Sequence, residues 1–184
     1  MIVTKNITKK YGDFLAIKNL SLNVKEGEIL CLLGANGAGK STIINILLNF
    51  TQPSSGTSEI NNLDVIKNSI KTKEFLTYIP ENLMLYPTLS ALENLDYFTK
   101  LSGKKFDSQE LEIYLLEAGL DLTVLNNRVS TFSKGMRQKV GIALAIAKKS
   151  KVLLLDEPTS GLDPKSSNDF IKLLKKMKSD GVAI

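Results

Sequence analysis

The sequence predicts an α/β protein with a mainly parallel sheet and an inserted helical region at about residues 83–135. Short apolar runs bounded by turn residues predict strands, and in the second half of the chain they alternate with helical stretches. The chain has 184 residues, of which 43% are hydrophobic and 23% charged. This length and composition are typical of a soluble globular domain with room for a small insertion.

The N-terminal half contains five predicted strands and one helix. The run at residues 28–33 is continuously apolar, which is typical of a strand buried on both faces of a sheet. Its cysteine, Cys31, is therefore expected to be buried. Residues 10–13 contain turn formers and are predicted to separate the first two strands. The predicted strands cover residues 2–8, 14–24, 28–33, 57–60 and 75–79, and the predicted helix covers residues 40–49.

From residue 83 onward the sequence predicts helices with recognisable ends. Ser90 with Glu93, and Asp107 with Glu110, have the spacing of a capping box. In this motif the side chain of the first residue accepts a hydrogen bond from the backbone N–H of the fourth. The side chain of the fourth residue accepts a hydrogen bond from the backbone N–H of the first. The other predicted elements are a helix at 133–149, a strand at 151–155, a helix from Pro164 to about 181 and a strand at 182–184.

Two absences limit the chemistry. The chain has no histidine, which excludes a Ser-His-Asp or Cys-His triad, a histidine general base and a His-ligated metal within it. Cys31 is the single cysteine, which excludes an internal disulfide and a cysteine zinc cluster. The net charge of +5 is spread along the chain and decides no partner. No apolar run approaches the roughly 18 residues of a membrane-spanning helix, and the N-terminus lacks the apolar segment of a signal peptide, so the sequence predicts a cytoplasmic protein.

A glycine-rich loop separates the strand at 28–33 from the helix at 40–49. It fits the pattern G-x-x-x-x-G-K-[ST], in which backbone N–H groups converge on a polyphosphate at the positive end of a helix. We expect the Lys40 ammonium to reach the β- and γ-phosphates and the Ser41 hydroxyl to bind Mg²⁺. The alternative is an ordinary glycine-rich turn, and the position between strand and helix favours phosphate binding. The expected nucleotide-binding residues of this loop are Gly34, Ala35, Asn36, Gly37, Ala38, Gly39, Lys40, Ser41 and Thr42.

Two adjacent carboxylates, Asp156 and Glu157, follow the predicted strand at 151–155. A buried strand rarely ends in two acids without a function. Asp156 is suited to hold Mg²⁺ through water, and Glu157 to polarise a water for in-line attack on the γ-phosphate. The alternative, that both residues begin a polar turn, is weaker beside a phosphate-binding loop.

Over essentially its whole length the chain resembles the nucleotide-binding subunit of an ABC transporter. Residues 132–138 resemble the signature sequence of that family, and Ser133 lies 23 residues before Asp156, as in the family. Lys134 and Met136 depart from the commonest form and match a version found in ABC-2-type exporters. The resemblance implies that Ser133 and Gly135 contact the γ-phosphate across a dimer. Ser133 as a plain helix cap is the alternative.

Other positions take their roles from the resemblance alone. Residues 160–163 resemble the dimer-contact loop, and Tyr11, in the predicted turn, stands where the family places a ring that stacks on adenine. Glu81 stands where most relatives have a glutamine that senses Mg²⁺ and couples to the membrane partner; a carboxylate is also a hard oxygen ligand but adds negative charge. Relatives continue past the strand at 182–184 into a turn with a histidine, so we expect the chain to be a truncated domain.

The resemblance implies a P-loop NTPase core at residues 1–82 and 136–184, with an N-terminal antiparallel β part, and a helical subdomain at 83–135. It implies an ATPase in which a homodimer encloses Mg-ATP and drives a separate transmembrane permease at the inner face of the cell membrane, with no nucleic-acid partner. Residues 78–103 and the variant signature are also similar to ATPases that accompany nitrous-oxide reductase maturation and copper processing. Two alternatives stay open: a soluble ABC-type ATPase that acts on nucleic acid or the ribosome, and a protein that only binds nucleotide.

Overall fold

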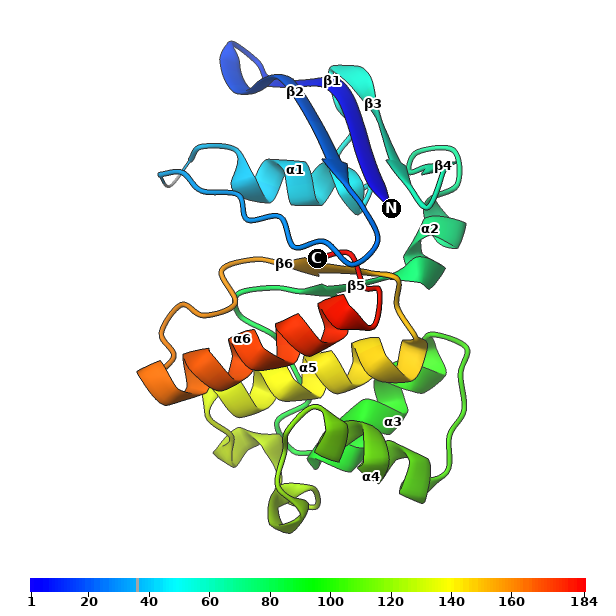
Figure 1. The fold of residues 1–184 in the computed structure, drawn as a ribbon, viewed down its shortest axis with the longest axis vertical. Coiled ribbons are helices and arrows are strands. Elements are labelled where there is room, and N and C mark those ends of the chain that lie inside the picture. Colours follow the sequence, from blue (N-terminus) through cyan, green and yellow to red (C-terminus); the bar gives the residue numbers. More distant parts are fainter. Residues whose placement is uncertain (36) are drawn as a thin grey trace. The chain divides into compact units, whose positions relative to one another are not determined.

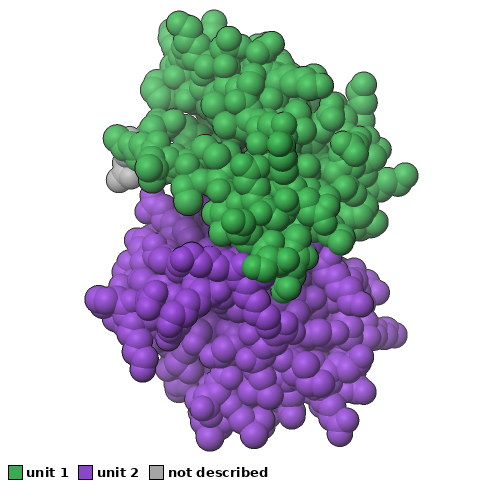
Figure 2. Space-filling view, viewed as in Figure 1, with its two compact units in different colours: residues 1–76, 151–154, 178–184 green, residues 77–150, 155–177 purple. Residues whose placement is uncertain are grey.

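A computed structural model describes residues 1–35 and 37–184. The chain forms two compact units, coloured separately in Figure 2. Unit 1 comprises residues 1–76, 151–154 and 178–184, and unit 2 comprises residues 77–150 and 155–177.

The first part of unit 1 is an antiparallel sheet of four strands in the order β2-β1-β3-β4 (Figure 1). The central strand β1 places Ile2 opposite Val24 of β2 and Ile60 of β3, and all three side chains are buried. Helix α1 packs against β2 and β3 through its apolar face. The sheet confirms the predicted N-terminal antiparallel part. Its elements and the helices of unit 1 are β1 (Ile2–Tyr11), β2 (Phe14–Val24), α1 (Lys40–Leu47), β3 (Ser55–Ile60), β4 (Leu63–Asp64) and α2 (Ser69–Phe75).

A second, separate sheet and one parallel bridge lie outside the four-stranded sheet. Strands β5 (Leu76–Ile79) and β6 (Val152–Leu155) form a two-stranded sheet. Val152 also forms a parallel bridge with Ala183, whose N–H donates to the Lys151 carbonyl oxygen at 2.9 Å. The expected strand at 182–184 is thus reduced to a single bridge in the described part of the chain.

The predicted strand at 28–33, buried on both faces, is wrong. In the described residues this segment forms no regular strand, and its backbone hydrogen bonds involve only Ile184. Leu30 N–H donates to the Ile184 carbonyl oxygen, and Ile184 N–H donates to the Glu28 carbonyl oxygen, each at 2.8 Å. A run paired over so few residues is left accessible, so the Leu33 side chain is 94% exposed and Cys31 is exposed rather than buried. The apolar pattern indicated a tendency to be buried, but it did not reveal how many neighbouring strands were available.

Unit 2 is mainly helical. Both predicted capping boxes are confirmed: the backbone N–H groups of Glu93 and Glu110 donate to Ser90 and Asp107 at 3.1 and 2.8 Å, and the glutamate side chains accept in return. The first three helices of this unit pack against one another, and Gly141 lies so close to Ile79 that a Cβ there would meet its Cδ1 at 3.1 Å. The helices are α3 (Ala91–Leu101), α4 (Ser108–Glu117), α5 (Lys134–Lys148) and α6 (Pro164–Ser179), with short 3₁₀ turns at Leu122–Val124 and Val129–Thr131.

Two further differences from the sequence-based expectations concern unit 1. Strand β1 continues to Tyr11, so the tight turn is Gly12-Asp13 and Tyr11 is a strand residue. Strand β4 and helix α2 were not expected; β3 and β4 form a hairpin whose two loop residues, Asn61 and Asn62, both have positive φ. The predicted helical subdomain at 83–135 lies within unit 2, and its boundaries stay a prediction.

Candidate functional site

The predicted phosphate-binding loop lies in unit 1 and leads into α1. Gly39 precedes the helix with a φ of 88°, and its carbonyl oxygen accepts from Ile43 N–H at 3.0 Å. The Lys40 ammonium folds back over the loop and donates to the carbonyl oxygens of Gly34 and Ala35 at 2.8 and 3.1 Å. The loop is thus wrapped around the lysine side chain at the start of a helix. Asn36, one of the expected binding residues, lies outside the described residues.

The glycine at position 39 is required by the local packing. A Cβ built there would lie 2.6 Å from the Ala16 carbonyl oxygen and 3.2 Å from Ile17 Cγ1, in a left-handed backbone conformation. At Gly37, which also has a positive φ of 83°, a Cβ would meet nothing within 4 Å. The pattern G-x-x-x-x-G-K-[ST] requires glycine at position 39 and leaves position 37 open, and the structure gives a packing reason for this difference.

The start of α1 is chemically suited to an anion. Its first turn has no acidic residue and carries Ser41, which is exposed, and the half-buried Thr42. The N–H groups of a helix's first turn have no intrahelical acceptor and carry partial positive charge. With the Lys40 ammonium beside them, these groups supply the positive charge and the hydrogen-bond donors that suit a phosphate chain, and phosphate binding by this loop remains a prediction.

Tyr11 is at the end of β1 with 48% of its surface exposed. Lys9 Nζ lies over its ring, 4.7 Å from the centroid, and donates to the Gln52 carbonyl oxygen at 2.7 Å. A lysine held in this way orients the ring by a cation–π contact. The predicted adenine stacking by Tyr11 remains a prediction.

In unit 2 the carboxylates Asp156 and Glu157 follow β6. Asp156 N–H donates to the Ile79 carbonyl oxygen at 3.1 Å, which fixes the backbone where β6 ends. Glu157 has a φ of 45°, in the left-handed region that glutamate seldom occupies. Burial first, and then the negative charge of Asp156, raise the pKa of the Tyr78 phenol above its ordinary value.

The signature segment forms the start of α5. Ser133 is exposed and caps the helix, because its Oγ accepts from Met136 N–H at 3.2 Å. Gly135 is buried, and a Cβ there would lie 3.5 Å from Leu162 Cδ2 and 3.6 Å from Ser166 Cβ. The predicted helix cap is confirmed, and the contact of both residues with a phosphate of a second chain remains a prediction.

Glu81 connects three of the predicted motifs. Its Oε1 lies 3.5 Å from Lys134 Nζ at the start of α5, and Ser160 Oγ donates to the same oxygen at 3.4 Å. The structure therefore brings Glu81, the signature segment and the loop at 160–163 together within unit 2. Sequence reasoning singled out both Glu81 and Lys134 as departures from the family but missed their pairing, which their opposite charges could have suggested.

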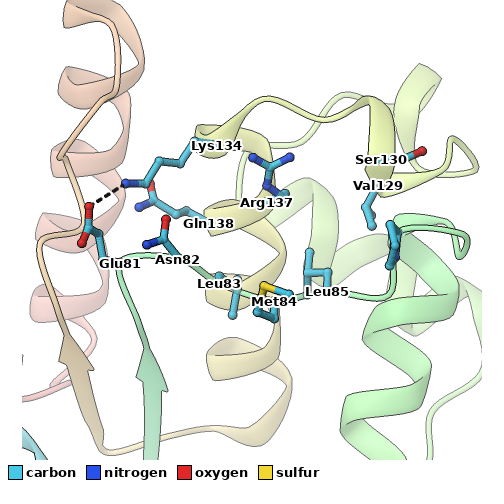
Figure 3. Close-up of a pocket in the computed structure, with 11 residues that line it drawn as sticks. Glu81, Asn82, Leu83, Met84, Leu85, Val129, Ser130, Lys134, Arg137 and Gln138 are labelled. Atoms are coloured by element: carbon cyan, nitrogen blue, oxygen red, sulfur yellow. Dashed lines mark ion pairs between the residues drawn. The ribbon is translucent and has the colours of Figure 1, made fainter.

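A cavity of about 440 Å³ opens beside this ion pair (Figure 3). Its walls combine charged side chains with an apolar stretch that includes Leu83 and Met84. Gln138 is 1% exposed, and within the described structure neither its amide nitrogen nor its amide oxygen has a hydrogen-bond partner. The sequence alone does not reveal Gln138, because a glutamine within an amphipathic helix carries no signal of its burial.

The described residues contain neither a cluster of metal-binding side chains nor a membrane-spanning helix. Within residues 1–35 and 37–184 no group of three or more His, Cys, Asp or Glu side chains forms a metal-binding cluster. No helix in the described part of the chain combines the length and apolarity needed to span a bilayer.

Residues 17–160 match a family model described as "ABC transporter". The chain belongs to the ABC transporter family. This ABC domain is 35% identical over 191 residues to the linearmycin resistance ATP-binding protein LnrL of Bacillus subtilis, with 100% of the chain and 60% of LnrL covered. It therefore spans less than two thirds of that relative.

Solved structures agree with this assignment. The ABC domain superposes on a dimeric post-hydrolysis state of the ATP-binding cassette MJ0796 bound to ADP and Pi with a TM-score of 0.84 and 30% identity, covering 99% of the chain and 85% of the cassette. It superposes on cbiO1 from Clostridium perfringens, described as part of the ABC transporter complex cbiONQ, with a TM-score of 0.85 and 26% identity, covering 99% and 75%. The P-loop NTPase fold and the predicted ABC-type ATP-binding domain are thus confirmed.

Proposed function

We propose that this ABC domain hydrolyses Mg-ATP as a homodimer and that the cycle of closure and hydrolysis drives a separate transmembrane permease. The observation that carries the proposal is the loop wrapped around Lys40 at the start of α1, which combines an ammonium group, backbone N–H groups and a helix N-terminus. Residues 34–42 bind the phosphates, and Tyr11 stacks on the adenine. Ser133 and Gly135 of the second chain complete the site.

The residues proposed for Mg²⁺ suit that ion. Ser41, Asp156 and Glu81 supply hydroxyl and carboxylate oxygens, the hard donors that Mg²⁺ prefers. Bound Mg²⁺ would neutralise part of the negative charge on the phosphates. Asp156 is half-buried, and its backbone is fixed by Ile79, so its carboxylate is presented from a rigid strand end.

Glu157 is the proposed base. Its carboxylate accepts a hydrogen bond from the attacking water and orients that water in line with the bond to be broken. The unusual backbone conformation supports this role, since left-handed φ values in residues other than glycine concentrate at functional sites.

The helical subdomain at 83–135 is the proposed docking surface for the permease. Beside it, the cavity at the start of α5 offers Glu81, Lys134 and Arg137 for polar contacts and Met84, 82% exposed, for apolar contact. Such a mixture of apolar and charged groups is typical of protein interfaces. The domain would then lie at the inner face of the cell membrane.

The finer subclass is also proposed. Lys134 and Met136 in the signature segment support an ABC-2-type exporter. Residues 78–103, with the same segment, support a relation to the ATPases of nitrous-oxide reductase maturation and copper processing.

Steady-state ATP hydrolysis with Mg²⁺ tests the proposal, with Glu157→Gln as the blank. We expect turnover in the parent and none in Glu157→Gln, which still binds ATP and accumulates as an ATP-bound dimer on size exclusion. Lys40→Ala should lose nucleotide binding, because the ammonium that balances the phosphate charge is gone. Parent-like turnover in Glu157→Gln refutes the role of the base, and parent-like affinity in Lys40→Ala refutes the phosphate-binding loop.

A further inference from the structure

The starting observation is that one carboxylate oxygen, Glu81 Oε1, has two partners from different segments. Lys134 Nζ comes from the first turn of α5, and Ser160 Oγ from the loop that follows Asp156 and Glu157. Figure 3 shows the Lys134 and Glu81 side chains extended toward each other along one wall of the cavity. The ion pair is partly shielded from solvent, since 24% of the Lys134 side chain and 42% of the Glu81 side chain are exposed.

Helix stability does not explain a lysine at this position. The N-terminus of a helix carries partial positive charge, so a cation in the first turn opposes the helix dipole. The first turn of α5 has no acidic residue that would compensate Lys134. The compensating charge therefore comes from outside the helix, and Glu81 supplies it.

The consequence concerns what else Glu81 binds. A carboxylate offers about four lone-pair positions over two oxygens, so an ion pair through Oε1 leaves it able to bind a cation as well. The Lys134 ammonium and that cation nevertheless compete for the same negative charge. An ammonium held 3.5 Å away thus weakens the attraction of the carboxylate for a second positive ion.

We propose that Lys134 is a positioning residue that restrains Glu81 and raises the Mg²⁺ concentration needed for nucleotide binding. The inference rests on the proposed function, in which Glu81 faces Mg²⁺. Ser160 has a lesser role: its hydroxyl orients the same oxygen without adding charge. The signature helix thereby controls, through Lys134, a carboxylate that belongs to another motif.

The test is a double-mutant cycle that measures binding rather than turnover. Affinity for a fluorescent ATP analogue is titrated against Mg²⁺ in the parent, Lys134→Met, Glu81→Gln and the double variant. We expect Lys134→Met to lower the half-saturating Mg²⁺ concentration roughly two- to fivefold, the range set by the strength of a partly exposed ion pair. In the Glu81→Gln background the same substitution should have no effect, because the carboxylate that Lys134 restrains is absent.

Lys139→Met is the matched control. It removes the same charge from the same helix, but Lys139 Nζ donates to the Gly119 carbonyl oxygen rather than to Glu81. We expect an unchanged Mg²⁺ midpoint, which separates the effect of Glu81 from a general change in the charge of α5. Circular dichroism of each variant checks that the overall helix content is unchanged.

The other outcomes are decisive as well. A parent that binds nucleotide, combined with no shift in Lys134→Met or an equal shift with and without Glu81, overturns the inference and leaves the proposed function standing. An equal shift would mean that Lys134 acts on the nucleotide directly. A parent that fails to bind the Mg-nucleotide overturns the proposed function and this inference together.

Discussion

Replacement of Gly39 by alanine tests whether backbone packing, rather than nucleotide chemistry alone, requires glycine in the phosphate-binding loop. The new Cβ would lie 2.6 Å from the Ala16 carbonyl oxygen and 3.2 Å from Ile17 Cγ1, at a φ of 88°. Gly37→Ala is the matched control, because its φ is 83° but no heavy atom lies within 4 Å of the added carbon.

The two substitutions share one cost and differ in another. A left-handed conformation costs an alanine about 1–2 kcal/mol at either position. Relief of a contact with a backbone oxygen, which cannot rotate away, adds about 1–3 kcal/mol at Gly39, as in other overpacked sites. The smaller freedom of the unfolded chain after Gly→Ala affects both variants alike and cancels in the comparison.

The assay is thermal and urea unfolding without nucleotide, followed by circular dichroism. A difference of about 1–3 kcal/mol in a protein of this length places the melting temperature of Gly39→Ala about 2–12 °C below that of Gly37→Ala. Equal melting temperatures would refute the reasoning, since they would show that the loop moves away from Ala16 at no cost.

Three further predictions concern contacts outside the loop. Gln138→Met should raise the melting temperature by a few degrees, because a buried amide without partners costs about 1–3 kcal/mol; a lower melting temperature would show that the amide is hydrogen-bonded. Ser166→Ala should raise the pKa of Asp163, measured by carbon NMR titration, since the hydrogen bond from the Ser166 side chain is the main cause that lowers it. A lowered carboxyl pKa stabilises the fold above the pKa of the unfolded chain, and this contribution is lost as pH falls through the folded value, so the stability difference between parent and variant should vanish in acid; an unchanged Asp163 pKa contradicts the assignment. Lys9→Met should lower the unfolding free energy by about 0.5–1 kcal/mol more in the parent than in a Tyr11→Leu background, because the hydrogen bond from Lys9 to the Gln52 carbonyl oxygen is lost in both; equal losses in both would show that the cation–π contact contributes nothing.

Features encoded within a few neighbouring residues could be predicted from the sequence. The two capping boxes begin at Ser90 and Asp107 as expected, because four consecutive residues contain both hydrogen-bond partners. The β3–β4 hairpin was missed although its signal was present: Asn61-Asn62 is a two-residue loop of the residue type that tolerates positive φ. The prediction of a strand at 28–33 was wrong for the opposite reason, since strand formation depends on partners far away in the sequence.

The candidate site also combines features encoded by neighbouring residues with features that depend on distant segments. The predicted phosphate-binding loop is a local motif, and the helix after it begins at Lys40 as expected, whereas the strand expected before it does not form in the described residues. The environment of Gln138 is not local: its burial beside the cavity depends on segments before α3 and before α5. The packing reason for glycine at position 39 is not local either, because it depends on Ala16 in β2.

The Glu81–Lys134 pair shows why single departures from a family pattern are best interpreted in space. Taken alone, Glu81 adds a negative charge where the family resemblance implies a neutral glutamine, and Lys134 adds a positive charge to the signature segment. Together they leave the local net charge unchanged and gain an ion pair at 3.5 Å. Neutralising one position therefore leaves a partly buried charge without its charged partner, whereas neutralising both leaves no unpaired charge. If the pair acts as a unit, the double variant Glu81→Gln with Lys134→Met, which keeps a good helix former at position 134, should be closer to the parent in unfolding free energy than either single variant. That order cannot arise from two independent substitutions that each destabilise the protein.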